Sequence, residues 1–272
     1  FSTANPNSIF STAESHKMLK GGIFLDMENL NRCGGWNIRF DAIKELVEAQ
    51  EVTIVRANAY MAIDEQRERM DEDYRRKKSE YRTVVRRAGF HVVLKQVQRW
   101  LNEDQEWVFK ANADIDLAID ALIQSQNLDY VLLGTGDGDF IRLVQALQDR
   151  GKRVDLLSFG NTSEDLRKQV DNHLSGWLFP EILPSFEEGS ERVRGYLHMV
   201  NEEKGFGFAT VQTGFGPYDI RTDVFVHITD FDEPIENRAF GMLKTSGRIL
   251  EFKVLELEDE RCQAKEITLL EP

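Results

Sequence analysis

The sequence of 272 residues has little cysteine, little proline and no long apolar run. Its two cysteines, Cys33 and Cys262, are too few and too far apart for a disulfide framework or a zinc site. No apolar stretch approaches the roughly 18–20 residues that span a bilayer, so we expect no transmembrane helix and no membrane partner. A reducing, cytoplasmic compartment is the simplest interpretation.

Basic residues are also in the minority, with 34 Lys and Arg against 47 Asp and Glu and a formal net charge of −13. This balance excludes a protein coated in basic surface, although a local basic stripe still allows binding to a polyanion. Hydrophobic residues make up 41% and charged residues 30%, which is the composition of a globular chain. The length suggests two domains.

Two regions of different periodicity follow an N-terminal segment that has none. Residues 1–19 are rich in Ser, Thr, Asn and Ala, and we interpret them as a disordered extension or a cloning remnant. Residues 20–180 alternate apolar runs with amphipathic segments, which predicts an α/β domain with a parallel sheet covered by helices on both faces. Residues 181–192 have the composition of a linker, and residues 193–272 carry five short strands typical of a small antiparallel barrel.

Acidic side chains follow the predicted strands of the first region. Asp26 ends the first strand, and Asp137 and Asp139 follow the strand at 130–135. Because ligands of parallel sheets bind beyond the carboxyl ends of the strands, we expect these acids to meet at one edge, together with Asp114 and Asp116 at the start of a helix over 115–126. Clustered carboxylates repel one another, and magnesium or manganese would remove that cost and activate water at a phosphate.

Helix capping is the alternative explanation for each single acid. Asp114, Asp137 and Asp139 stand where Asp commonly caps or favours the start of a helix. Asp26, at the end of a buried strand, is the acid that capping explains least well. A short match of FLDMEN to the DxD of haloacid-dehalogenase-type phosphatases is a further alternative, from which Glu28 departs.

Residues 21–180 resemble the NYN family, the PIN-like ribonuclease domains that include the bacterial LabA-like proteins. The resemblance lies in FLDMENL (24–30), KANADIDLAID (110–120) and the run from GTGDGDF to VDLLSFG (134–160). It implies magnesium- or manganese-dependent cleavage of RNA, with metal-site acids at Asp26, Asp114, Asp137 and Asp139. Asp116 occupies a position that varies in the family. The resemblance assigns further roles to Asn29, as part of the catalytic pattern, to Lys110, as an RNA contact, and to Thr135, as a supporting hydroxyl.

A strongly basic segment lies in the middle of the first region. Residues 75–99 contain nine basic residues against one acid, Glu80, and we predict that they form a helix. One interpretation is a track for the RNA backbone, beginning with Arg75, Arg76, Lys77 and Lys78. The alternative is a solvated helix face without a ligand.

Alternating aromatic residues mark two strands of the second region. Phe206 and Phe208 share one strand face in GFGF, and Phe225 and His227 share one in DVFVH. Exposed rings on neighbouring strands of a small barrel form a stacking platform for single-stranded bases, and Lys204 lies close by in sequence. The alternative is that the phenylalanines belong to the core.

The second region resembles a cold-shock domain, a five-stranded OB-fold, through NEEKGFGF and DVFVHI. The resemblance implies base stacking on Phe206, Phe208, Phe225 and His227 and a phosphate contact at Lys204. Met199 and Val200 replace the usual Trp-Phe pair, and QTGFGPYDIRT (212–222) lengthens one loop. Ten basic and sixteen acidic residues over 191–272 predict weaker single-strand binding than in a free cold-shock protein.

Together these features predict a cytoplasmic, metal-dependent endoribonuclease whose second domain binds and presents single-stranded RNA. Single-stranded DNA is a further candidate substrate, and the oligomeric state, a homodimer included, is left open. The alternative from another class is a non-catalytic RNA-binding adaptor with a degenerate PIN-like domain. DNA cleavage or phosphatase activity is a third hypothesis.

Overall fold

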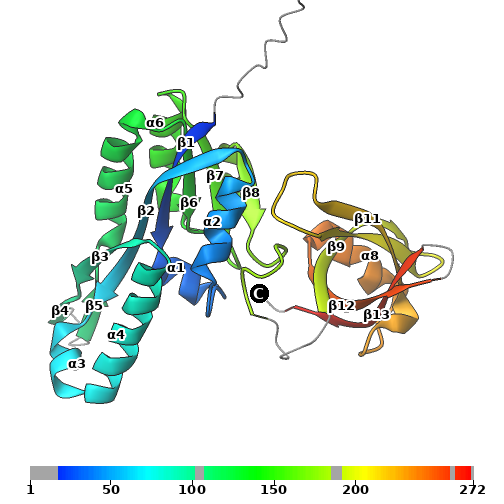
Figure 1. Cartoon of the computed structure of the whole chain (residues 1–272). Helices are drawn as coiled ribbons and strands as arrows, with labels where there is room; N and C mark the ends of the chain where they lie inside the picture. Colours follow the sequence, from blue (N-terminus) through cyan, green and yellow to red (C-terminus); the bar gives the residue numbers. More distant parts are fainter. Residues whose placement is uncertain (1–17, 102–106, 185–191, 258–260, 271–272) are drawn as a thin grey trace, which may run out of the picture.

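The computed structural model describes residues 18–101, 107–184, 192–257 and 261–270, with the backbone alone for 99–101 and 107–110. It has two parts, a sheet covered by helices and a closed barrel (Figure 1). Of the extension predicted over residues 1–19, residues 1–17 lie outside this description, and the first strand begins at Leu19. No helix in the described ranges is long and apolar enough to cross a membrane.

The first part is built on a six-stranded parallel sheet in the order β3-β2-β1-β6-β7-β8. Its strands are β1 (Leu19–Asp26), β2 (Val52–Ile63), β3 (His91–Gln96), β6 (Tyr130–Gly134), β7 (Arg153–Ser158) and β8 (Asn172–Ser175). From β1 the chain proceeds to β2 and β3 on one side and then returns past β1 to β6 on the other. The carboxyl ends of β1 and β6 therefore meet where the strand order reverses, with Leu25 opposite Gly134.

Helices cover both faces of this sheet, as the sequence predicts. One face carries α1 (Met27–Arg32), α2 (Phe40–Glu48) and α4 (Glu72–Arg87), and the other carries α5 (Ala113–Gln124), α6 (Ile141–Gln148) and α7 (Glu164–Gln169). The central strand β1 serves both cores, because Ile23 and Leu25 are buried in one and Phe24 in the other. A strand buried on both sides has a continuous apolar sequence, which is why its pattern indicated a parallel sheet.

The basic segment is shorter as a helix than the sequence predicts. Asp71 accepts a hydrogen bond from the backbone N–H of Tyr74 and caps α4, which ends at Arg87. A separate short helix, α3 (Glu65–Met70), precedes it. The prediction of one helix to residue 99 is wrong, because Gly89 takes a left-handed conformation (φ 87°) and β3 follows. Lys95 accordingly lies in the sheet.

Several short elements of the first part are not predicted by the sequence. They are α1, α7, β8 and the antiparallel hairpin of β4 (Gln98–Leu101) and β5 (Trp107–Lys110). Four to six residues carry too little periodicity to be recognised. The segment predicted as a linker over 181–192 also begins inside this part, since Ile182 and Leu183 are buried in its core.

The second part is a closed five-stranded barrel in the order β10-β11-β13-β12-β9, consistent with an OB-fold. Its strands are β9 (Arg192–Asn201), β10 (Phe206–Gln212), β11 (Ile220–His227), β12 (Ile249–Glu256) and β13 (Cys262–Leu269). The prediction of a purely antiparallel barrel is wrong for one pair, because β11 and β13 run parallel where the barrel closes. Between β11 and β12 the unpredicted helix α8 (Asn237–Ser246) buries Phe240 and Leu243 in the barrel core.

Within the described ranges, Phe215 and Arg194 connect the barrel to the first part. Phe215, in the long loop between β10 and β11, packs against the core that includes α2, and its carbonyl oxygen accepts a hydrogen bond from Gln50 Nε2 at 3.2 Å. Arg194 on β9 places its guanidinium carbon 5.7 Å from the ring centroid of Trp177, which follows β8. The loop insertion at 212–222 thus makes an interdomain contact.

Candidate active site

Asp26 is a nearly buried carboxylate at the carboxyl end of the central strand. It is 5% exposed, and its Oδ1 accepts a hydrogen bond from the backbone N–H of Asn29 at 3.0 Å. Asp26 therefore caps α1, so the expectation that capping would explain this acid poorly is wrong. Burial raises the pKa of the Asp26 carboxyl to about 6, and the negative charge of Asp114 adds to the increase.

Hydrogen bonds connect Asp26 to the glycine-rich loop after β6. The Thr135 hydroxyl donates to Asp26 Oδ2 at 3.3 Å and accepts from the backbone N–H of Asp137 at 3.2 Å. Asn29 Oδ1 accepts from the backbone N–H of Gly136 at 2.7 Å. Four predicted site residues, Asp26, Asn29, Thr135 and Asp137, are thus brought together by side-chain and backbone bonds across the switch point.

Gly136 has a packing reason to be glycine. A Cβ atom there would lie 3.2 Å from Thr162 Cα and 3.4 Å from both Asn161 O and Asn29 Oδ1. The loop 160–163 is also bonded to this position, since the Ser163 N–H donates to the Gly136 carbonyl oxygen at 2.9 Å. The acidic loop is therefore held between α1 on one side and the loop after β7 on the other.

Asp137 and Asp139 follow Gly136 in this loop. Asp137 is half-buried, and its Oδ1 accepts from the Asp139 N–H at 3.0 Å, which starts the short 3₁₀ turn Gly138–Phe140. Asp139 is exposed and shares a cleft of about 460 Å³ with Asp114 and Arg142. The structure therefore places the first turn of α5 next to the acidic loop, as the sequence predicts.

Asp116 has a different environment from the other acids. Its carboxylate pairs with Lys95 of β3 at 2.8 Å, and Asp120, one turn later, accepts from the Tyr60 hydroxyl at 2.9 Å. These bonds direct this side of α5 toward β2 and β3. Asp116 already has a structural cation, so it is the weakest of the five predicted acids as a metal ligand.

The chemistry of the site suits a hard divalent cation. Asp26 is a buried carboxylate whose charged form is disfavoured by burial and by Asp114, and a bound cation would reverse that penalty. The neighbouring donors are all oxygens, which is the ligand type of magnesium and manganese. Among the described residues no three His, Cys, Asp or Glu side chains already stand in metal-binding geometry. Metal dependence stays a prediction.

Part of the basic charge on α4 is neutralised locally. Arg75 pairs with Glu72 at 3.0 Å and Arg76 with Asp73 at 2.9 Å, both within the first turns of the helix. In the described part of the chain Lys77 and Lys78 make no such ion pair, although Lys78 lies 5.6 Å from the Tyr74 ring. Lys78 also lines a small cavity with Glu28 and Asn31 of α1, so α4 adjoins the helix that Asp26 caps. The side chain of Lys110 lies outside the described residues.

The aromatic residues of the barrel form one continuous outer face. Phe206 stands opposite His227 and Phe208 opposite Phe225 in the β10–β11 pair. The Phe206 and Phe225 rings stack at 5.7 Å, and those of Phe225 and His227 stack at 6.3 Å. All four side chains are partly exposed, while Gly207, Ala209, Val224 and Val226 between them are buried. The alternative that these phenylalanines are core residues is therefore wrong.

Lys204 and Met199 border this aromatic face. Lys204 is exposed in the turn that precedes β10, and its backbone N–H donates to Asn201 Oδ1 at 3.1 Å. Met199 stands opposite Phe208 on β9 and is 40% exposed, so it extends the apolar surface.

The structure also brings together residues that the sequence did not single out. Ser158 and His173 lie on neighbouring strands, with Ser158 Oγ and His173 Nε2 2.7 Å apart, and the Thr162 hydroxyl donates to Ser158 at 2.7 Å. Burial lowers the pKa of His173 to about 4, and the positive charge of Arg167 contributes. No motif marks these residues, because they are 4–15 positions apart and meet through strand pairing.

A buried sheet with acids at its switch point, next to a basic helix, defines a nuclease-like α/β domain of the PIN type. The chain belongs to the NYN family, since the NYN domain matches residues 20–182.

The chain also resembles individual proteins. It is 25% identical over 120 residues to "Low amplitude and bright protein LabA" of Synechococcus elongatus, a match that spans 43% of this chain and 62% of LabA. It is also similar to the crystal structure of a protein of unknown function from Vibrio parahaemolyticus. That match has 28% identity and a TM-score of 0.47 and covers 59% of this chain and 94% of the other.

Proposed function

We propose that the protein is a magnesium- or manganese-dependent endoribonuclease that acts on single-stranded RNA. The observation that carries the proposal is the bonded set of Asp26, Thr135 and Asp137 at the switch point, with Asn29 fixing the same loop. Membership of a nuclease-like family supports the same reaction class. A bound ion would supply an activated water and neutralise charge on the scissile phosphate.

The residues of the chain would position that chemistry. Asp26 holds the Thr135 hydroxyl, and Thr135 holds the backbone of Asp137, so the acidic loop is preorganised before substrate arrives. Asp137 bonds through Oδ1 alone among the described residues, which leaves its Oδ2 for a cation. Asp139 and Asp114 face the same cleft and would hold the ion from its other side.

The aromatic face of the barrel supports the RNA-binding part of the proposal. Four rings in register on two strands offer stacking surfaces that every base can use, and Lys204 adds a positive charge at one end. The cold-shock resemblance of these same residues points to the same ligand. The acidic barrel would repel an RNA backbone except near its few cations, so stacking would carry most of its affinity.

Cleavage of an end-labelled, single-stranded RNA tests the function. We expect internal cleavage with magnesium or manganese and none in chelator, while binding persists in chelator. Binding without cleavage at any metal concentration would identify the protein as an RNA-binding adaptor. Cleavage of DNA instead of RNA, or hydrolysis of a small phosphate ester, would contradict the proposed substrate.

A further inference from the structure

A cleft of about 410 Å³ lies between the NYN domain and the barrel. The NYN domain lines it with the loop residues Asn161 and Thr162, with Arg167 of α7 and with Trp177. The barrel lines it with Tyr196 of β9 and with Arg248, which stands between α8 and β12. It is a second candidate site, on the side of the NYN domain that faces the barrel.

The cleft is directly connected to the acidic loop. Asn161 and Thr162 line the cleft, and the same two residues pack against Gly136, within 3.4 Å of the position that a Cβ atom would take. The next residue, Ser163, bonds to the Gly136 carbonyl oxygen. One loop therefore separates Asp137 from the cleft.

The charged groups of the cleft are cations that lack acidic partners. In the described ranges neither Arg167 nor Arg248 forms an ion pair, and the neighbouring Glu164 bonds to Lys168 instead, at 2.7 Å. His173, on the same wall, is neutral above about pH 4 because burial and Arg167 lower its pKa. Two guanidinium groups, one from each domain, thus face a space that an anion could enter.

Aromatic rings accompany these cations. Trp177 packs edge-to-face on Phe159, with ring centroids 5.6 Å apart, and Tyr196 on the opposite wall is 37% exposed. Guanidinium groups beside aromatic rings are the combination by which channels hold single-stranded nucleic acid, through phosphate contacts and base stacking.

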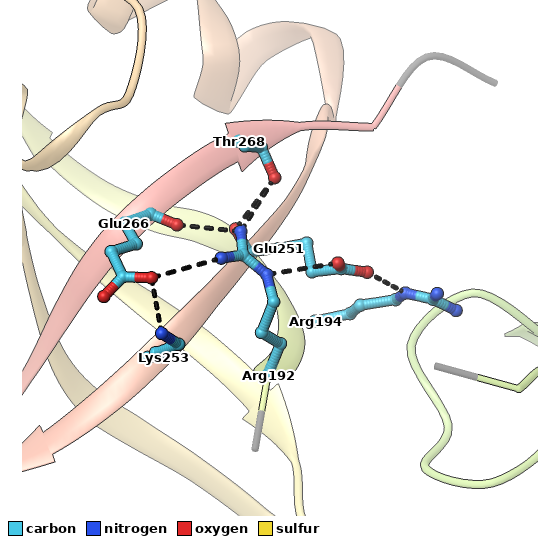
Figure 2. Close-up of polar contacts among 6 residues, drawn as sticks. All are labelled: Arg192, Arg194, Glu251, Lys253, Glu266 and Thr268. Atoms are coloured by element: carbon cyan, nitrogen blue, oxygen red, sulfur yellow. Dashed lines mark hydrogen bonds and ion pairs between the residues drawn. The ribbon is translucent and has the colours of Figure 1, made fainter. Parts of the chain in front are cut away.

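A network of ion pairs on β9 and β12 lines a neighbouring, smaller cavity. Figure 2 shows Arg192 and Arg194 converging on Glu251, at 3.2 and 2.8 Å, with Arg192 also bonded to Thr268 at 3.0 Å. All three charged side chains are close to 90% buried. Arg194 of this network also lies over the Trp177 ring, which lines the cleft.

We infer that this cleft is the path of the RNA strand between the two domains, with Arg167 and Arg248 each holding a backbone phosphate. The inference rests on the proposed RNA-binding function and assigns it a second contact region besides the aromatic face of the barrel. A strand held there would leave the cleft beside the acidic loop, so binding by the barrel would feed the site at Asp137.

RNA length and charge reversal test this path. Binding is measured in chelator with labelled single strands of about 5 and about 20 nucleotides, because one OB-fold covers about 4–16 nucleotides. We expect the double variant Arg167→Glu, Arg248→Glu to bind the longer strand about 10-fold more weakly and the shorter strand within about 2-fold of the wild type. Each phosphate contact contributes about 0.7 to the salt slope, so this variant should lower the slope by about 1.4.

Three further variants serve as controls. Lys20→Glu reverses an exposed charge at the start of β1, outside the cleft, and it should change neither affinity nor slope. The pair Arg167→Lys, Arg248→Lys keeps the charge and should recover most of the binding. Phe206→Ala removes a ring of the platform and should weaken binding to both lengths.

The outcomes separate the path from the proposed function. One outcome is that the double Glu variant binds the longer strand as tightly as the wild type, while Phe206→Ala binds it more weakly. The inferred path through the cleft is then wrong, and RNA binding by the aromatic face of the barrel is supported. If Phe206→Ala has no effect or the protein binds no RNA, the proposed function fails and the path fails with it. Binding of a polyglutamate peptide, but not of RNA, through both arginines would also overturn the path.

Hydrogen exchange on the wild type gives a readout that does not depend on variants folding. The 20-nucleotide strand should slow exchange at residues 159–163 and 246–249, on the two walls of the cleft. Protection of the platform strands without these segments would contradict the path.

Discussion

The two domains build their candidate sites in different ways. In the NYN domain the polar groups come from the end of β1, from α1 and from the loop after β6, which is more than 100 residues away in sequence, and they bond to one another. In the barrel the site is a strand face, built by the adjacent strands β10 and β11, whose rings stack without hydrogen bonds between them. The first site depends on the topology of the whole domain, whereas the second depends on the register of one hairpin.

This difference predicts different responses to substitution. Removing one group from the bonded set should eliminate a chemical function, because its members position one another. Removing one ring from the platform should weaken binding in part, because the other rings still stack.

The largest expected effect is at the acidic loop. Asp137→Asn should lower the cleavage rate by at least about 100-fold and leave the thermal unfolding temperature close to that of the wild type, since Asn keeps the Oδ1 acceptor for the Asp139 N–H. Asp116→Asn is the matched control, because Asp116 is paired with Lys95. An equal loss of cleavage rate in both variants would show that Asp116 matters as much for cleavage as Asp137.

The next effect concerns stability in acid. His173 has a folded pKa of about 4, below its ordinary 6.5, so the unfolded chain binds a proton that the folded chain does not. This residue alone should make stability fall as the pH drops from about 6.5 to about 4, by up to about 3 kcal/mol. The pKa of Asp26, which burial raises to about 6, acts in the opposite direction over much of this range, so the measurement is the difference in urea unfolding between the wild type and His173→Gln. A difference that does not change with pH would show that the pKa of His173 is not lowered in the folded protein.

A moderate effect is expected at the platform. Phe225→Ala should cost about 1–3 kcal/mol of affinity for single-stranded RNA through lost stacking. Tyr218→Ala, which removes a ring of the same domain that is 91% exposed and outside the platform, is the control. The thermal unfolding temperatures of both variants must match that of the wild type. Equal RNA affinities of the two variants would show that the aromatic face does not bind RNA.

The smallest effect is expected on α4. Lys77 and Lys78 have no acidic partner in the described structure, so replacing both by Ala should lower the single-strand salt slope by about 1.4. Arg75 and Arg76 are paired with Glu72 and Asp73 and should contribute less when replaced in the same way. If neither pair of substitutions alters the salt slope, α4 is a solvated helix that does not contact the RNA backbone.

Much of the fold can be predicted from local patterns in the sequence. The continuous apolar strands indicate the sheet, and the period-two alternation of Phe206 and Phe208 indicates the outer face of the barrel. The helix predicted over 115–126 is observed as α5, two residues earlier. Its buried residues include Leu117 and Ala121, whereas Ile115, Ile119 and Ile123 are 50–60% exposed.

The features that the sequence did not predict depend on contacts between segments that are far apart in the sequence. The pairing of Asp116 with Lys95 needs β3 to lie beside α5, and the cleft that Arg167 and Arg248 both line needs the two domains side by side. The cap at Asp26 went unrecognised for a different reason, because α1 has only six residues and little periodicity of its own.

The central position of β1 has a consequence for synthesis of the protein on the ribosome. β1 pairs with β2 soon after it emerges, but its other neighbour, β6, follows about 110 residues later, or roughly 5–20 s at about 5–20 residues per second. During that interval one edge of β1 is unpaired, and Asp26 is made before Asp137. A nascent chain therefore cannot assemble the acidic site before residue 139 has emerged, and its open apolar edge is the surface on which chaperones would act.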